Sequence, residues 1–132
     1  MLQRDYLLEI IGKFVATIRH YLLPALLNKD TVALDTAEEE IAELAGLGRE
    51  MGLDVTPDTL VMMMELSGVA DSVASYTAWS LERVSEAHRN NGETAKAELR
   101  HEQAVLVAET YGWNLDATPE EFEELAQQLG IA

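Results

Sequence analysis

Apolar residues recur at intervals of three and four along most of the chain, which is the spacing that places side chains on one face of an α-helix. The segment that ends at Leu23 has such a stripe, formed by Leu7, Ile10, Ile11, Phe14, Ile18, Tyr21 and Leu22. Because Leu8 and Val15 lie outside the stripe, we expect this helix to contact neighbours on several sides and to be central. Pro24 predicts a kink or an end of the helix before Asn28.

Capping residues and glycines mark the next two helices. A second helix is predicted to begin at Asp30 or Thr31, whose side chains can accept hydrogen bonds from free backbone amides, and to end before Gly46. A third is predicted to begin at Thr56-Pro57-Asp58, which combines a capping hydroxyl, a proline for the first turn and an acid at the positive end of the helix dipole. Its run Val61-Met62-Met63-Met64 is apolar on almost all sides, which favours a place in the core.

Two long helices are predicted on either side of Asn91-Gly92. The first runs from about Asp71 to Asn90 and has one face formed by Val73, Thr77, Leu81, Val84 and His88. The second runs from Glu93 to Tyr111 and has a stripe of small residues, Ala97, Ala104 and Ala108. Because the loop between them is short, they form an antiparallel hairpin. A last helix is expected to be capped by Thr118, with Pro119 as its first residue, and to stop at Gly130.

These segments predict an all-α protein with one domain over residues 1–132, in which five or six helices pack as antiparallel hairpins. A chain of 132 residues with 48% hydrophobic residues is long and apolar enough for one core. The chain has no cysteine, which excludes disulfides, thiolate metal sites and a cysteine nucleophile, and we expect a cytoplasmic protein.

The net negative charge of the chain argues against some classes of binding partner. The net charge of −15 repels phosphate backbones and anionic lipids, so nucleic acid is not an expected partner; simple solubility also accounts for the excess of acids. Charged residues interrupt the apolar run near the N-terminus, which argues against a signal peptide or membrane anchor; they are Arg4, Asp5, Glu9, Lys13 and Arg19.

The hairpin from about Ala78 to Tyr111 resembles a tetratricopeptide repeat, with Gly92 in the loop, Ala97 five residues later and Ala104 seven beyond that. It departs from the repeat at Leu81 and His101, where aromatic residues are usual, so the resemblance is to a tetratricopeptide-like hairpin. A weaker likeness covers the first two helices, with Asn28 in their loop and Ala33 five residues later. The resemblance implies a short array of two such hairpins.

A second resemblance is confined to the start of the chain. The sequence Gln3-Arg4-Asp5-Tyr6-Leu7-Leu8, continuing to Ile11, is similar to the start of a family of short, uncharacterised bacterial helical proteins. That family has no assigned activity. The resemblance implies a helical fold and a bacterial source, and it implies no function.

Catalytic and metal-binding patterns are incomplete in this sequence. Glu98-x-x-His101 has the spacing by which di-iron carboxylate bundles supply ligands from one helix, but no second such pair follows it. The chain has no Gly-x-Ser-x-Gly elbow and no glycine-rich phosphate loop. We therefore expect no cofactor, no metal and no enzymatic activity.

The tetratricopeptide resemblance implies a partner-binding face, because the inner face of the first helix of such hairpins commonly binds peptides. On this chain that face would present Trp79, Glu82, Glu86, Arg89 and Asn90. Glu82 and Glu86 would repel a peptide carboxylate, so a basic segment is the expected ligand. The alternative is that the rest of the domain covers this face.

The sequence therefore favours a protein–protein interaction or structural module, with a metal-binding or enzymatic helical bundle as the alternative. The first helix and the Met62–Met64 segment are apolar on several sides, and few helices are available to cover them. We expect a homodimer to cover one of these surfaces.

Overall fold

The computed structural model describes residues 2–131 of the chain, and within that range it contains helices and no strand. The side chains of residues 2–4, which include those of Gln3 and Arg4 in the opening motif, lie outside what the structure describes. The elements are α1 (Leu2–Leu27), α2 (Thr31–Leu44), α3 (Pro57–Ser67), α4 (Ala70–Asn90), α5 (Thr94–Tyr111), the 3-10 turn η1 (Glu120–Phe122) and α6 (Glu123–Gln128). The prediction of an all-α fold is confirmed.

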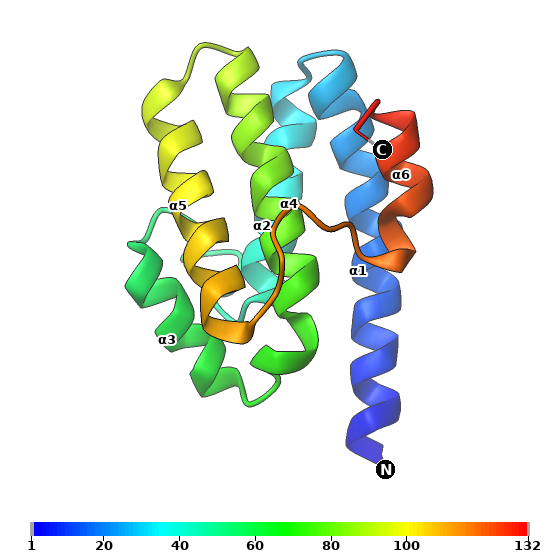
Figure 1. The fold of residues 1–132 in the computed structure, drawn as a ribbon, viewed down its shortest axis with the longest axis vertical. Coiled ribbons are helices and arrows are strands. Elements are labelled where there is room, and N and C mark those ends of the chain that lie inside the picture. Colours follow the sequence, from blue (N-terminus) through cyan, green and yellow to red (C-terminus); the bar gives the residue numbers. More distant parts are fainter. Residues whose placement is uncertain (1, 132) are drawn as a thin grey trace.

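Two antiparallel hairpins form the body of the molecule, as predicted (Figure 1). One consists of α1 and α2 and the other of α4 and α5, while α3 packs against α5. After α5 the chain crosses α4 and places α6 beside α1. Residues 45–69, which include α3, separate the two hairpins. Their likeness to tetratricopeptide repeats stays a prediction.

The central helix is α4, which contacts α1, α2, α3 and α5, so the expectation that the first helix is central is wrong. The reason lies in helix length. With its 26 residues α1 is about 39 Å long, whereas the 14 residues of α2 span about 21 Å. The first turns of α1 therefore extend past the end of α2, and Figure 1 shows them projecting from the body. We call residues 5–13 the α1 overhang.

Local capping explains most helix ends. The Asp30 side chain accepts a hydrogen bond from the Ala33 amide at 3.0 Å, and Thr56 accepts one from the Thr59 amide at 3.2 Å, which confirms both predicted starts. Gly46, at φ +90°, follows α2 in a left-handed conformation that suits glycine. Pro24 lies inside α1, which continues to Leu27, so the helix runs past the predicted end near Leu23 and stops before Asn28.

The start of the last helix differs from the prediction. Pro119 is extended, at φ −56° and ψ 143°, so it precedes the helix instead of forming its first residue. A 3-10 turn begins at Glu120, and no side chain caps it, so Thr118 does not act as a cap. The α-helix proper is then short, Glu123–Gln128. The turn places Phe122 in the core, where it is fully buried.

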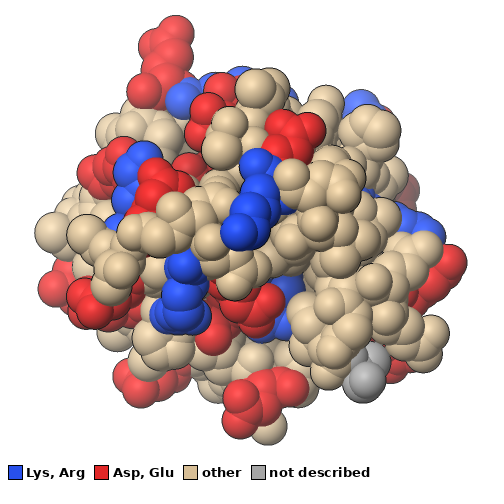
Figure 2. Space-filling view, turned by 90° about the horizontal axis from the view of Figure 1, so that it is seen from above, with Lys and Arg blue, Asp and Glu red and all other residues tan. Residues whose placement is uncertain are grey.

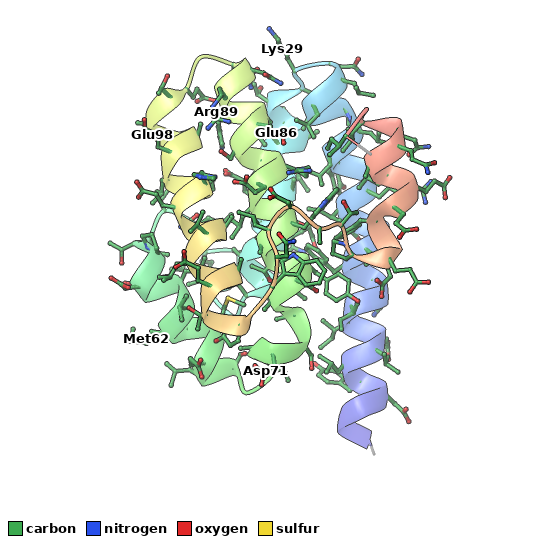
Figure 3. All side chains as sticks on the ribbon, viewed as in Figure 1. Lys29, Met62, Asp71, Glu86, Arg89 and Glu98 are labelled. Atoms are coloured by element: carbon green, nitrogen blue, oxygen red, sulfur yellow. The ribbon has the colours of Figure 1, made fainter. Side chains whose placement is uncertain are left out.

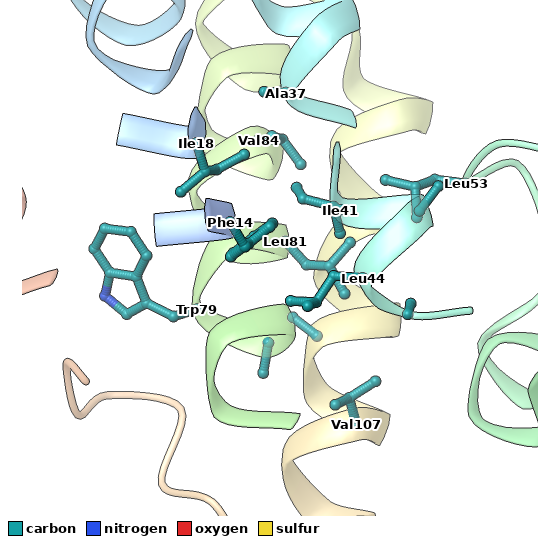
Figure 4. Packing of buried hydrophobic residues seen from close by; sticks show 14 of the residues in the cluster. Phe14, Ile18, Ala37, Ile41, Leu44, Leu53, Trp79, Leu81, Val84 and Val107 are labelled. Carbon is teal, nitrogen blue, oxygen red and sulfur yellow. The ribbon is translucent and has the colours of Figure 1, made fainter. Parts of the chain in front are cut away.

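The core lies where the two hairpins meet, and Figure 4 shows the side chains that fill it. They come from every long helix, and the buried members include Phe14, Ile18, Ile41, Leu44, Trp79, Leu81, Val84 and Val107. The methionine run of α3 is divided. Met64 is fully buried, whereas Met62 is 54% exposed on the outward face of α3 (Figure 3).

By length and hydropathy alone, one helix in the described part of the chain could cross a membrane, namely Asp5–Leu27 in α1. The core helix of a water-soluble fold passes the same test. Several residues of this span are indeed buried between the hairpins: Phe14, Ile18, Leu22 and Ala25. The expectation that the chain has no membrane anchor stays a prediction.

Candidate functional site

On the α4 face that the sequence predicts for partner binding, the aromatic side chain of Trp79 is covered by another part of the chain. Trp79 is only 1% exposed, because Phe122 stacks on it with ring centroids 4.5 Å apart and an interplanar angle of 19°. On α4 itself, the guanidinium of Arg83 lies over the indole ring, 4.9 Å from its centroid. A partner could touch Trp79 only if the C-terminal segment moved away.

The other four predicted residues lie farther along the same helix. Glu82 is next to His101 of α5, with 2.6 Å between Oε1 and the ring nitrogen Nδ1. Glu86 lies 3.2 Å from a guanidinium nitrogen of Arg83, and burial raises the pKa of Glu86 despite that cation. Arg89 and Asn90 are exposed near the end of α4, where Figure 3 labels Arg89. The face is thus open only toward its C-terminal end.

A buried polar network joins α5 to the loop between α2 and α3. Arg100 is 2% exposed, and its guanidinium donates to Glu38, to Asp54 at 2.7 Å and to the Leu53 carbonyl at 3.1 Å. Next to it, the Gln103 amide donates to the carbonyls of Leu53 and Val55 at 2.7 and 2.9 Å. The Gln103 amide provides a partner for the Val55 carbonyl, while the bonds to Leu53 add to the one that its carbonyl accepts from the Val55 amide at 2.8 Å.

His88 extends this network to α4. Its Nε2 lies 2.9 Å from a carboxylate oxygen of Glu38, and its Nδ1 lies 3.0 Å from one of Glu93. Burial alone would lower the pKa of His88, but the hydrogen bonds to both carboxylates outweigh it and the pKa is raised. For Glu38, burial would raise the pKa, yet the hydrogen bonds from His88 and Arg100 lower it. Both ring nitrogens of His88 are engaged, so we assign the network to packing of the helices.

The Glu98-x-x-His101 pair does not gather further ligands. His101 faces Glu82 across the hairpin, while Glu98 lies exposed on the outer side of α5 (Figure 3). Over residues 2–131, no group of three His, Asp or Glu side chains is placed to hold a metal ion. One histidine paired with one carboxylate falls short of the ligand set of a di-iron site.

A groove runs between the α1 overhang and the C-terminal end of α2, and its cavity volume is about 570 Å³. That volume is within the range of about 300–1,000 Å³ typical of ligand sites. Its apolar lining comes from Tyr6, Ile10, Phe14 and Leu44. Its polar lining comes from Lys13, Thr17, Glu40, Glu43 and Arg49. We call this feature the α1–α2 groove.

Charged side chains meet at one edge of the α1–α2 groove. The Arg49 guanidinium contacts three carboxylates of α2, with 2.8 Å from Nε to Glu43, 3.5 Å from a terminal nitrogen to Glu39, and a further bond to Glu40. These hydrogen bonds, led by the one to Glu40, raise the pKa of Arg49. The edge can therefore hold a cation close to apolar side chains.

Acidic side chains do not form a patch at the end of the molecule where the loops of the two hairpins, α1–α2 and α4–α5, lie. Figure 2 views this end from above, and acidic and basic side chains alternate across it, so neither sign forms an unbroken patch. At the α1–α2 groove and overhang, by contrast, acids outnumber bases among the described side chains: the acids are Asp5, Glu9, Glu39, Glu40 and Glu43, and the bases are Lys13 and Arg49.

Sequence reasoning missed Arg100, Gln103 and the groove residues. For Arg100 a signal was present, because it occupies the position between Ala97 and Ala104 on the stripe of small residues, where a buried side chain is expected. The groove gave no such signal, since its two walls come from residues 6–17 and 40–49 and only the fold brings them together.

No family model matches the chain, and no curated protein or solved structure matches it either.

Proposed function

We propose that this protein is a protein–protein interaction module, in which the paired hairpins are the scaffold and the α1 overhang with its groove is the contact surface. The supporting observation is a large apolar side chain left exposed on the overhang: Tyr6, which lines the groove together with Ile10, is 66% exposed. Exposed apolar residues that cluster beside a groove usually mark an interaction site.

The arrangement of charges favours a protein over a lipid bilayer as the contact. Glu9 and Lys13 lie within the overhang, and both would enter the hydrocarbon if Asp5–Leu27 spanned a membrane. A charged side chain at the centre of a bilayer costs about 2.5–3.5 kcal/mol on insertion scales. A protein surface can instead pair with these charges at the rim of an interface and cover the apolar residues between them.

The test is site-specific photo-crosslinking in the source cell. A photoreactive amino acid replaces Tyr6 or Lys13, which lie on the overhang and line the groove, and in parallel Arg89 on α4 or Glu98 on the outer face of α5. We expect adducts with another protein from the overhang positions, and none from position 98. Absence of protein adducts at all four positions would refute the proposed function.

A metal-binding or enzymatic bundle is the competing class. Elemental analysis of the purified protein separates the two, because a site of that kind would retain iron, zinc or manganese in a fixed ratio to protein. Stoichiometric metal would replace the interaction proposal as the first hypothesis.

A further inference from the structure

The α1–α2 groove combines an apolar floor with an acidic edge, and this combination restricts what can occupy it. Tyr6 and Ile10 of the overhang face Leu44 at the end of α2, and Glu40 and Glu43 follow along α2 on the same side. A matching occupant needs apolar side chains for the floor and positive charge for the edge.

We infer that the α1–α2 groove binds a basic amphipathic helix of a partner protein, with its apolar face on Tyr6, Ile10 and Leu44 and a lysine or arginine against Glu40 and Glu43. The inference rests on the proposed function and specifies the chemistry of its partner.

The walls of the groove favour a helix over an extended segment. Except for Arg49, the lining residues belong to α1 and α2, whose backbone groups are bonded within the helices, so they offer no edge to which a strand could pair. A helix satisfies its own backbone and needs only side-chain contacts. The overhang, residues 5–13, spans about 14 Å, which matches about two and a half turns of a bound helix.

Arg49 indicates how a cation is held at the acidic edge. Its guanidinium already contacts Glu39, Glu40 and Glu43, although its side chain is 48% exposed. Ion pairs in contact with water are weak, so the carboxylates can be shared with a second cation at little cost. A basic residue of the partner would neutralise the acids that Arg49 leaves in excess.

A second copy of this chain is disfavoured as the occupant by its charge. The groove and overhang of each copy have five acidic side chains and two basic ones among those described, and the whole chain has a net charge of −15. Pairing two such surfaces would bring like charges together, whereas a basic helix is attracted to them.

The experiment measures binding of a defined probe by fluorescence anisotropy. The probe is a labelled peptide of about 18 residues that has leucines on one helical face and lysines on the other, and its control has glutamates in place of the lysines. Binding is measured at roughly 150 mM salt, where long-range attraction is screened. We expect one molecule of the lysine peptide to bind, and the glutamate peptide not to bind.

Matched variants locate the binding site. Tyr6→Ala lies in the groove, and Leu8→Ala lies on the same helix about 160° around its axis, with similar exposure. We expect Tyr6→Ala to weaken binding about tenfold and Leu8→Ala to change it by less than about twofold. Glu43→Gln should weaken binding about twofold to fivefold, whereas Glu98→Gln on α5 should not. Both altered groove residues are exposed, so the fold should persist; circular dichroism checks this.

Several outcomes would overturn the inference. Failure of the lysine peptide to bind, or equal weakening by the groove and control variants, would mean that the groove is not the site. Equal binding of the glutamate peptide would refute the charge argument. If sedimentation shows a dimer that Tyr6→Ala dissociates, the occupant is a second copy. Crosslinking to another protein from position 6, with no binding of the lysine peptide, would leave the proposed function intact while this inference fails.

Discussion

Replacing Phe122 by alanine tests whether the C-terminal segment is part of the core or only rests on it. The ring is fully buried and stacks on Trp79, and it meets Phe14 and Tyr76 edge-on with centroid separations of 6.4 and 5.9 Å. Emptying a buried phenylalanine site costs about 3–5 kcal/mol. The upper half of that range applies here, because aromatic pairs add about 0.5–1.5 kcal/mol beyond the area they bury.

The free energy of unfolding is measured by urea titration, with circular dichroism and tryptophan fluorescence as separate probes. In a Trp113→Phe background Trp79 is the single tryptophan, so its emission reports directly on the contact with Phe122. We expect Phe122→Ala to shift that emission to longer wavelength in the native state, because the indole becomes exposed to water. The control is Val32→Ala, at a side chain that is 73% exposed, where the change should stay within about 0.5 kcal/mol.

A loss below about 1 kcal/mol with unchanged Trp79 emission would refute the reasoning. This result would mean that Trp79 is shielded from water without Phe122, and that the C-terminal segment contributes little to the free energy of unfolding. A large emission shift with a small loss of stability would instead show that the segment detaches locally, which would open the α4 face to a partner.

Three further outcomes are expected. Phe14→Ala should cost about 3–5 kcal/mol in denaturant titration, since Phe14 is 4% exposed, and a loss below about 1 kcal/mol would place it outside the core. Because the pKa of His88 is raised, its pairing with Glu38 stabilises the fold fully below about pH 6.5, and this stabilisation is lost as pH rises through the higher folded-state pKa. The difference in Tm between wild type and His88→Gln should therefore shrink from pH 6 to pH 9. A constant difference would contradict this prediction. The homodimer is expected to form through the exposed Met62 and Leu66 on α3. It should weaken when salt is lowered from roughly 150 to roughly 10 mM, and Leu66→Glu should abolish it. Sedimentation of a 14.6 kDa monomer in both buffers would exclude the dimer.

Local sequence signals determined the helices and most of their ends. Asp30 and Thr56 cap helices because each accepts a bond from an amide three residues ahead, and the stripe from Val73 to His88 is buried because helical spacing places it on one face. Both interactions involve near neighbours in the chain, so their pattern can be recognised without the fold. The short loop at Gly92 likewise predicts the antiparallel pairing of α4 with α5.

The tertiary structure alone decided which surfaces are available. Trp79 is covered because Phe122, far along the chain, stacks on it, and Arg100 is buried because Glu38 and Asp54 of distant segments accept its hydrogen bonds. The groove exists because α1 is longer than the helix paired with it. Periodicity describes which side of a helix is apolar, but it does not say which segment will cover that side or how far the cover extends. That depends on contacts between residues remote in sequence, which only the folded chain brings together.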